Sequence, residues 1–492
     1  MGETAHFDDV TVRASMTHRE PIEELSEVGT AFERLRAHRW RVAQTSAEER
    51  IQRIRRLRDA VVARREELCK ALWDDYRKNA AEVELTEILP VVGEANHAIR
   101  HLKGWLRPVG VGTPLTLLGT RSYILHEPKG VVLILAPWNY PFGLLLIPLI
   151  AAISAGNVVG VRSSSKVPHT AQFLASFLAD LFPPEEVSVF AGGHAVADAL
   201  LELPFDHIFF TGSPSVGRKI MAAAAKQGAS VTLELGGKSP AIVDRTADVT
   251  KAAERILWAK FVNAGQTCVA PDYVLVNDSR CEEFVCEARR ILAARYGETE
   301  QARQANTSYC RLVSDSHQDG LMRVLEAARA AGATIAFGGA SISAERYLAP
   351  TLLTSITEDN PIMQDEIFGP ILPIVSFRDI EDAIRVVRSK PKPLALYVFA
   401  RDRKLVRRVL RETTAGGTCV NTAMIHLENP NLPFGGVGNS GLGSYHGYFG
   451  FLAFSHARAV LTQGPLDILK LFYPPYTPGR SKMLNFVTRY FA

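Results

Sequence analysis

Cysteine is scarce in this sequence, and neither sign of charge dominates it. The 492 residues include 6 cysteines with no Cys-x-x-Cys pair among them, which excludes a disulfide framework and the common zinc sites. We therefore expect no metal site, a reducing compartment and a cytoplasmic location. Lysine and arginine (56) exceed aspartate and glutamate (52) by only 4, so the charge gives no reason to expect a nucleic-acid partner.

A targeting or membrane-spanning segment is also lacking. Residues 1–25 are polar and charged, so we expect no signal peptide. Residues 131–161 carry no charge and are long enough to span a bilayer, but prolines and glycines interrupt them. We expect a strand, a loop, a buried helix over Leu144–Ala155 and another strand there, and hence no transmembrane segment.

The composition and the pattern are those of a globular α/β protein. Apolar residues make up 47% and charged residues 22%, which excludes disorder, a collagen-like fibre and a coiled-coil rod. The length predicts two or three domains, and we find no internal repeat.

From residue 131 on, short β-branched runs alternate with helical patterns, which indicates βαβ units on parallel sheets. The first expected strands are Val131–Leu135, Val158–Val161, Val187–Phe190, His207–Phe210 and Val231–Leu235. The helices expected between them are Thr170–Leu181, His194–Leu201 and Ser215–Lys226. A second round comprises the strands Ala241–Val243 and Tyr273–Val276 and the helices Val249–Asn263 and Cys281–Tyr296. We expect two α/β domains that meet near Gly236–Gly237.

Cys268 is the candidate nucleophile. A lone cysteine is usually a small buried hydrophobe, which is our interpretation of the other five. Cys268 instead follows an expected helix and the polar, flexible run Gly265–Thr267, so it is placed as an exposed, activated thiolate would be.

Glu234 is the candidate base, 34 residues before Cys268. It lies in an apolar strand, where burial would raise the pKa of a carboxyl group towards the working pH. A strand glutamate that faces water, or one paired with Lys238, is the alternative, and the sequence leaves both open.

Two loops at the ends of expected strands are candidate binding segments, because ligands bind at that edge of a parallel sheet. Asn139, between two prolines, would donate its amide to an oxyanion or simply form a turn. Ser213 begins an expected helix. The amides at its start would bind a pyrophosphate, or Ser213 would simply serve as the helix N-cap. The run Gly436–Gly441 matches the dinucleotide fingerprint but follows no clear strand, so we dismiss it.

Together these segments resemble the aldehyde dehydrogenase superfamily, most closely its class 3 branch, over about residues 30–478. The motifs that carry the resemblance are Pro137–Phe142, Phe210–Ser213, Leu233–Lys238, Gly265–Cys268, Glu366–Pro370 and Leu432–His446. Six motifs in order with family-like spacing are very specific. The last motif and the later Tyr473–Pro478 look like class 3.

The resemblance implies a Rossmann-like cofactor domain, an α/β catalytic domain and a small β arm for oligomerisation. We assign 26–118 and 130–236 to the first, 237–430 to the second, 119–129 and 447–462 to the arm, and 463–492 to a C-terminal tail. A homodimer is expected. For the tail, a docked or frayed terminus is favoured over contact with a membrane.

The resemblance also implies NAD(P)-dependent oxidation of an aldehyde to the acid. Cys268 would form a thiohemiacetal whose oxyanion Asn139 and the Cys268 amide hold, and a thioester would follow. Glu234 would activate the water that releases the acid, with Lys238 in support. The cofactor is expected on Trp138, Arg162, Ser165, Gly212, Ser213, Gly217, Leu235, Gly236, Glu366 and Phe368.

The cofactor segment departs from the family at one place. After the strand that ends at Val161, the family has Lys-Pro-Ser-Glu, whereas here the run is Arg162–Ser165. A carboxylate there repels a 2′-phosphate, and Arg162 with serines would accept one. We therefore expect NADP to be used at least as well as NAD.

The substrate is expected to be an apolar aldehyde, aromatic or aliphatic of medium or long chain, because the motifs contain no arginine for a substrate anion. The expected pocket residues are Tyr140, Trp258, Thr267, His426 and Phe434. A cysteine hydrolase that uses His207, His426 or His446 as the base is one alternative. A non-catalytic relative is another, although Cys268, Glu234 and Asn139 are all present.

Overall fold

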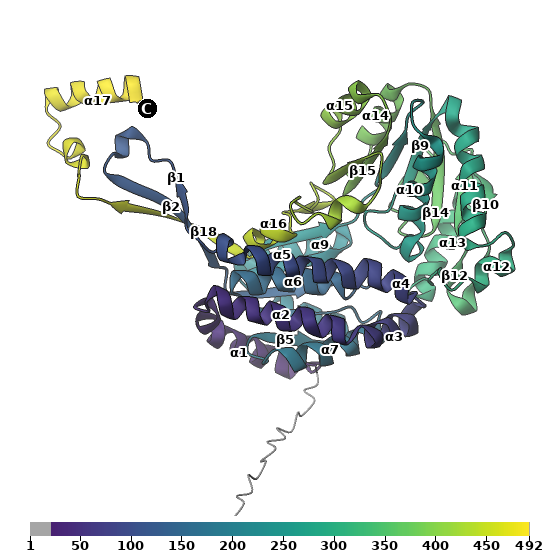
Figure 1. Ribbon diagram of the computed structural model, residues 1–492, viewed down its shortest axis with the longest axis horizontal. Helices are drawn as coiled ribbons and strands as arrows, with labels where there is room; N and C mark the ends of the chain where they lie inside the picture. The colour runs from purple at the N-terminus through teal and green to yellow at the C-terminus, as the bar shows by residue number, and fades with distance from the viewer. Residues whose placement is uncertain (1–20, 492) are drawn as a thin grey trace, which may run out of the picture.

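The computed structural model describes residues 21–491 and consists of a two-part body with a narrow arm (Figure 1). Each part has its own sheet, and the sheets contain six, seven and three strands. The architecture is mixed α/β with largely parallel sheets in the body, as expected.

The six-stranded sheet has the order β17-β7-β6-β3-β4-β5, and all of its pairs are parallel except that of the short β17 with β7. The five strands expected in the first round are confirmed, with small differences at their ends. The strands are β3 (Val131–Leu135), β4 (Val158–Arg162), β5 (Val187–Phe190), β6 (His207–Gly212), β7 (Ser230–Leu235) and β17 (Gly441–Leu442).

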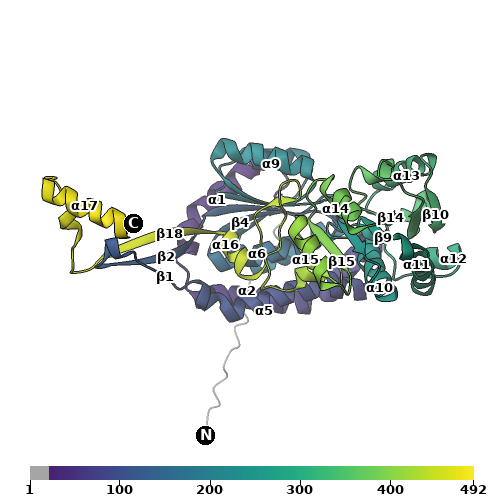
Figure 2. The same ribbon diagram turned by 90° about the horizontal axis from the view of Figure 1, so that it is seen from above.

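Helices cover both faces of this sheet, which is why its central strands are apolar without alternation. Figure 2 shows α1 and α9 on one side and α2 and α5 on the other. The helices of this part are α1 (Leu25–Ala43), α2 (Ala47–Ala63), α3 (Arg65–Tyr76), α4 (Ala80–Val83), α5 (Leu89–Trp105), α6 (Gly143–Ala155), α7 (Pro168–Leu181), α8 (His194–Leu201), α9 (Pro214–Gln227) and α16 (Gly447–Ala453). A π-helical turn, η1 (Glu84–Ile88), joins α4 to α5.

The uncharged run 131–161 folds as expected, into β3, the helix α6 and β4. Helix α6 is buried over nearly its whole length between the sheet and α2 and α5, so its apolar residues lie in the protein core. Within residues 21–491, no helix is both long enough and apolar enough to cross a bilayer.

The seven-stranded sheet has the order β10-β13-β14-β9-β8-β15-β16. Its strands are β8 (Pro240–Val243), β9 (Tyr273–Asn277), β10 (Thr334–Phe337), β13 (Thr351–Thr354), β14 (Ile371–Phe377), β15 (Ala395–Phe399) and β16 (Gly417–Val420), beside the small pair β11 (Ser341–Ile342) and β12 (Tyr347–Leu348). Its helices are α10 (Val249–Phe261), α11 (Cys281–Tyr296), α12 (Glu300–Ala305), α13 (Asp315–Ala330), α14 (Ile380–Arg388) and α15 (Arg403–Glu412). The chain passes from the first sheet to the second between β7 and β8, around Gly236–Gly237.

The arm is a three-stranded sheet in the order β1-β2-β18, which extends away from the body (Figures 1 and 2). Its strands are β1 (Val109–Val111), β2 (Thr120–Pro128) and β18 (Ser455–Gln463). Two domain boundaries differ from the prediction. Strand β1 belongs to the arm, although it lies in the segment 26–118 that was assigned to the cofactor domain. Residues 447–453 were assigned to the arm but form α16, which packs on α5 and α6. The tail forms α17 (Pro478–Phe491), which contacts residues 115–117 at the far end of the arm.

Candidate active site

The loop that carries Cys268 is held in an unusual backbone conformation. Helix α10 ends at Phe261, earlier than expected, because Asn263, Ala264 and Gly265 all have positive φ angles (55°, 49° and 73°). A side chain at Gly265 would collide with the carbonyl oxygen of Gly369, since a Cβ there would lie 2.3 Å from it. Glycine is therefore required at that position, and the tight turn places the Cys268 loop against the loop that follows β3.

The Cys268 loop is hydrogen-bonded to the Asn139 loop that follows β3. The Asn139 side chain donates to the Gln266 carbonyl at 3.0 Å, and the Asn263 side chain donates to the Asn139 carbonyl at 2.8 Å. Tyr76 also donates its hydroxyl to the Asn139 carbonyl, at 3.0 Å. Asn139 thus lies beside the cysteine loop, as its expected role requires. Asn263, Gln266 and Tyr76 were missed by the sequence analysis because each looks like an ordinary helix or loop residue.

Glu234 is 2% exposed, and neither of its carboxylate oxygens has a hydrogen-bond partner among residues 21–491. Burial alone raises its pKa well above the ordinary value. The alternative of a strand glutamate that faces water is therefore wrong. An unpartnered carboxyl group in an apolar strand is costly for folding, which is typical of a functional site.

The amine of Lys238 donates to groups other than Glu234, so the pairing of the two residues that the sequence left open is not formed, and support of the base by Lys238 stays a prediction. Its amine donates to Asp272 Oδ2 at 2.5 Å and to the carbonyls of Ile362 and Asp365 at 2.8 and 2.7 Å. All of its donors are therefore used to tie the segment after β7 to the second sheet.

The run Gly436–Gly441, dismissed as a cofactor motif, lies directly against Glu234. Gly441 pairs with Glu234 across the β17–β7 ladder, and the Leu235 amide donates to the Ser440 carbonyl at 3.0 Å. A Cβ at Gly441 would lie 2.4 Å from the Leu233 carbonyl oxygen. These glycines let a second segment approach the strand of the candidate base.

Cys268 opens on a cavity of about 520 Å³ with a largely apolar lining. Four of the five expected pocket residues line it, namely Tyr140, Trp258, Thr267 and Phe434. His426 does not, because its ring turns towards Cys419, with Nδ1 3.3 Å from the sulfur.

One wall of this cavity comes from α5, which the sequence analysis did not associate with the site. The lining residues of α5 run from Leu89 to Arg100, which corresponds to about 16 Å of helix. Arg100, Glu94 and Glu428 are charged residues in the lining, so the cavity contains an arginine that lies outside the motifs considered in the sequence.

The thiol of Cys268 is not activated by these surroundings, contrary to expectation. Burial first, and then the charges of Glu366 and Glu234, together raise its pKa to about 12. His446 lines the same cavity, but burial and the neighbouring His426 lower its pKa to about 4, and it makes no hydrogen bond to Cys268 among those recorded for residues 21–491. His207 hydrogen-bonds to Ser230, remote from the cavity, so no Cys–His pair is formed there.

The expected cofactor residues gather at the carboxyl ends of β4, β6 and β7. Ser213 caps α9 by accepting from the Val216 amide at 3.4 Å. A Cβ at Gly217 would lie 2.7 Å from the Leu235 side chain, and one at Gly212 would lie 2.4 Å from the Phe210 ring. Both glycines therefore keep the start of α9 close to the sheet.

The remaining cofactor residues form a second group nearer Cys268. A Cβ at Gly236 would lie 2.1 Å from a Glu366 oxygen, so this carboxyl group rests against the bare backbone after β7. The rings of Trp138 and Phe368 meet edge to face at 5.4 Å, and Phe368 has a positive φ of 51°.

Two buried polar atoms in this region lack partners in the described chain, Arg162 Nε and Thr211 Oγ1. Arg162 also donates to the carbonyls of Gly192 and Gly193 at 2.8 and 3.0 Å, while Ser165 is exposed. Orphaned donors, a helix N-terminus and glycines that expose backbone suit a dinucleotide with a pyrophosphate. Across residues 21–491, no cluster of His, Cys, Asp or Glu is suited to a metal ion.

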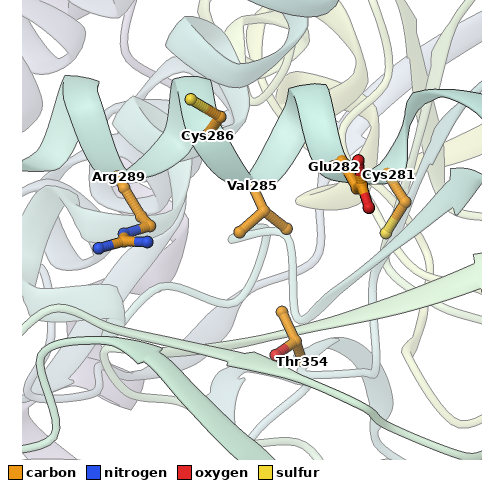
Figure 3. A pocket seen from close by; sticks show the side chains of 6 residues that line it. All are labelled: Cys281, Glu282, Val285, Cys286, Arg289 and Thr354. Atoms are coloured by element: carbon orange, nitrogen blue, oxygen red, sulfur yellow. The ribbon is translucent and has the colours of Figure 1, made fainter.

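A second hollow of about 540 Å³ lies between α11 and β13 (Figure 3). Cys281, Val285 and Arg289 point from α11 towards Thr354 of β13 (Figure 3). It contains none of the expected site residues, so the cavity at Cys268 remains the candidate active site.

Comparison with known proteins points to one family. The family model described as "Aldehyde dehydrogenase family" matches residues 16–460. The chain is 42% identical over 436 residues to the 4,4'-diaponeurosporen-aldehyde dehydrogenase of Staphylococcus aureus, covering 89% of this chain and 94% of that protein. It is 42% identical to the human aldehyde dehydrogenase family 3 member B1 over 418 residues, 84% of this chain and 87% of that one.

A solved structure is similar to this chain in both fold and sequence. The structure titled "Substrate bound state of Staphylococcus Aureus AldH" superimposes with a TM-score of 0.89 and 39% sequence identity. The match covers 93% of this chain and 99% of that chain.

Proposed function

The chain belongs to the aldehyde dehydrogenase family as a class 3-like, NAD(P)-dependent enzyme, and we propose that it oxidises apolar aldehydes through a thioester on Cys268. The observation that carries the proposal is the apolar cavity of about 520 Å³ onto which Cys268 opens. Asn139 lies on a loop that is hydrogen-bonded to the Cys268 loop, and Glu234 is near enough for its charge to act on Cys268.

In the first step, Cys268 gives up its thiol proton to solvent and Sγ attacks the aldehyde carbon, so that the carbonyl π bond breaks and the carbonyl oxygen becomes an oxyanion. Asn139 gives one N–H to the Gln266 carbonyl, and an amide group has a second N–H to offer. That second donor and the Cys268 backbone N–H would hold the oxyanion, which is worth about 10²–10³ in rate for each donor.

When bound, the nicotinamide cofactor supplies the hydride acceptor that turns the thiohemiacetal into a thioester. Glu234 then removes a proton from the water that attacks the thioester. The carbon–sulfur bond breaks, the acid is released, and the Cys268 thiolate takes up a proton to restore the thiol. A carboxyl group with a raised pKa is suited to this task, because its conjugate base is a strong proton acceptor.

The nicotinamide end of the cofactor would be held by Glu366 and Phe368, and the phosphates by Trp138 and the start of α9 at Ser213. The adenine ribose would lie near Arg162 and Ser165. The absence of a carboxylate at residue 165 supports use of NADP at least as well as NAD, although the charge of Asp198 also acts on Arg162. A preference for NAD of more than about tenfold in kcat/KM, or about 1.4 kcal/mol, would contradict this.

A homodimer through the arm is also part of the proposal. β18 forms one edge of the arm sheet, and an edge strand offers unpaired backbone groups to a second copy. Light scattering on the purified protein tests it, and a monomer at micromolar concentration would contradict it.

A cytoplasmic location agrees with the free cysteines of the described chain.

A matched pair of substrates tests the apolar preference. Methyl 4-formylbenzoate and 4-carboxybenzaldehyde are similar in size and only the second is charged, so the apolar lining should favour the neutral ester by about tenfold or more in kcat/KM. Aliphatic aldehydes of increasing length should gain kcat/KM with each methylene, because the wall formed by α5 is about 16 Å long. A preference for the charged aldehyde would overturn the proposed substrate class.

A further inference from the structure

Lys78 is a fully buried lysine that contacts the loop after β3. It lies between α3 and α4 and is 0% exposed. Its Nζ is 3.3 Å from Glu87 Oε1 and 4.1 Å from the centre of the Tyr140 ring. Burying an ion pair often costs as much in desolvation as the pair returns, so stability is a weak reason for a lysine at this position.

Glu87 holds the other side of this pair. It lies in the π-helical turn η1 and is 0% exposed, and its Oε2 accepts from the Gly143 amide at 2.7 Å. Gly143 begins α6, and negative charge is favoured at the start of a helix. π-helical turns are rare and are frequently found at functional sites. Lys78 is therefore paired with a carboxylate that has a fixed place of its own.

Tyr140 connects Lys78 to the residue that precedes Cys268. The face of its ring receives the Lys78 amine in a cation–π contact. Its hydroxyl lies 2.6 Å from the Thr267 hydroxyl, and both of these side chains line the cavity of Cys268. A chain of contacts thus reaches Cys268 from Lys78, which is not among the described residues that line the cavity.

The peptide unit between Thr267 and Cys268 is held on its Thr267 side at two points. The Thr267 hydroxyl is bonded to Tyr140, and the Thr267 carbonyl accepts from the Ala270 amide at 3.0 Å. A peptide unit is planar and rigid, so this carbonyl and the Cys268 N–H turn together. The direction of the N–H that is proposed to hold the oxyanion therefore depends on Tyr140.

We propose that Lys78 is a positioning residue for the reaction at Cys268. Together with Glu87, it fixes the ring of Tyr140. The Tyr140 hydroxyl in turn holds Thr267, so that the Cys268 N–H points towards the place of the oxyanion. This inference rests on the proposed role of that N–H, and its test needs neither an aldehyde nor the cofactor.

Two reagents separate an effect on the oxyanion from an effect on the thiol. With 4-nitrophenyl acetate, a bond forms between Cys268 Sγ and the ester carbon, the carbonyl oxygen becomes an oxyanion, and 4-nitrophenolate then leaves. Iodoacetamide alkylates the same sulfur with loss of iodide and forms no oxyanion. Both rates are measured on the full-length, cofactor-free enzyme at one pH, and peptide mass mapping confirms that Cys268 is modified.

The double variant Lys78→Met with Glu87→Gln removes both charges of the pair. Methionine fills the space, and glutamine keeps an acceptor for the Gly143 amide, so the melting temperature should hold. Acylation by 4-nitrophenyl acetate should fall by about tenfold or more, which is part of the effect of losing one oxyanion donor. Alkylation should change by less than about twofold, because the thiol itself is not displaced.

Tyr140→Phe is the second variant, and it tests the same route if the double variant does not fold. It removes only the hydroxyl that meets Thr267, and it should show the same selective loss of acylation. In this background, loss of the Lys78–Glu87 pair should slow acylation by less than about twofold more, because two changes along one route do not add.

Arg53→Met is the matched control. Arg53 of α2 pairs with Glu186 at 2.6 Å, and both side chains are mostly buried. Glu186 precedes β5, so this pair lies at the amino end of that strand, whereas the candidate cofactor residues lie at the carboxyl ends. Loss of this pair should change neither rate.

Equal losses of acylation and alkylation in the double variant would mean that the whole Cys268 loop is displaced, and the proposal would be wrong. Acylation at the unmodified rate in either variant, or a further tenfold loss when they are combined, would equally overturn it. An enzyme that shows the expected acylation pattern but oxidises no aldehyde would contradict the proposed function and support this inference.

Discussion

The side-chain amide of Asn139 donates to the carbonyl oxygen of Gln266 at 3.0 Å, two residues before Cys268. This hydrogen bond joins the loop after β3 to the loop before β9, and so it joins the two sheets at the candidate active site. The same side chain thus has a structural partner and a second N–H that faces no recorded acceptor within the described residues.

Replacing Asn139 should separate these two roles. In Asn139→Ala, loss of one oxyanion donor should lower kcat/KM by about 10²–10³. The position of the Cys268 loop should hold, because Asn263 also donates to the Gln266 carbonyl, at 3.2 Å. Steady-state kinetics measure the first effect, and iodoacetamide alkylation of Cys268 measures the second. If alkylation slows as much as turnover, Asn139 only positions the loop.

The pH dependence of turnover should be displaced towards alkaline pH. Glu234 must lose its proton before it can accept one from water, and burial raises its pKa well above the ordinary value of about 4.3. The rate of deacylation should therefore fall as pH drops through the raised pKa, at a pH where an exposed glutamate is still ionised. Measuring kcat against pH tests this, and an acid limb at about pH 4–5 would show that Glu234 is not the limiting base.

The glycines next to Glu234 should be intolerant of a side chain. In Gly441→Ala, a Cβ 2.4 Å from the Leu233 carbonyl must push β17 away from β7, so kcat should fall with the displacement of Glu234. Gly29→Ala in α1 is the control, because a Cβ there meets no atom within 4 Å. Equal activity and equal melting temperatures for the two variants would argue against a role for β17 in holding Glu234.

Much of the fold was predictable because its strands are short apolar runs in a regular α/β alternation. The prolines and glycines of the uncharged run 131–161 showed that it is not one membrane-spanning helix. Its middle part forms the buried helix α6, which contains Pro148. The end of α10 was not predictable, since the left-handed conformations of Asn263 and Ala264 have no signal in an apolar, helix-like run. Tertiary hydrogen bonds from the Asn263 side chain to the Asn139 carbonyl and from the Gln266 side chain to the Arg311 carbonyl hold this turn.

The residues of the candidate site that lie in a motif were predicted from the sequence. Those whose place in the site depends on contacts between segments far apart in the sequence were missed. Lys238 follows Glu234 closely in sequence, yet it turns to Asp272 on the other sheet. His426 turns to Cys419, and the wall that contains Arg100 comes from a helix more than a hundred residues before Cys268. Gly436–Gly441 was dismissed as a cofactor motif because no clear strand precedes it. Its pairing with β7 was missed because that strand is far away in the sequence.

Trapping the acyl-enzyme tests the account most directly. Glu234→Gln is mixed with benzaldehyde and NADP, reduced cofactor is followed by absorbance, and the enzyme is then digested for mass mapping. The account predicts one fast equivalent of reduced cofactor, then a stall, with a benzoyl group on the peptide that contains Cys268. Cys268→Ala should give neither the burst nor the acyl group while still binding NADP. A Glu234→Gln enzyme that turns over continuously, or one acylated at another residue, would contradict the account.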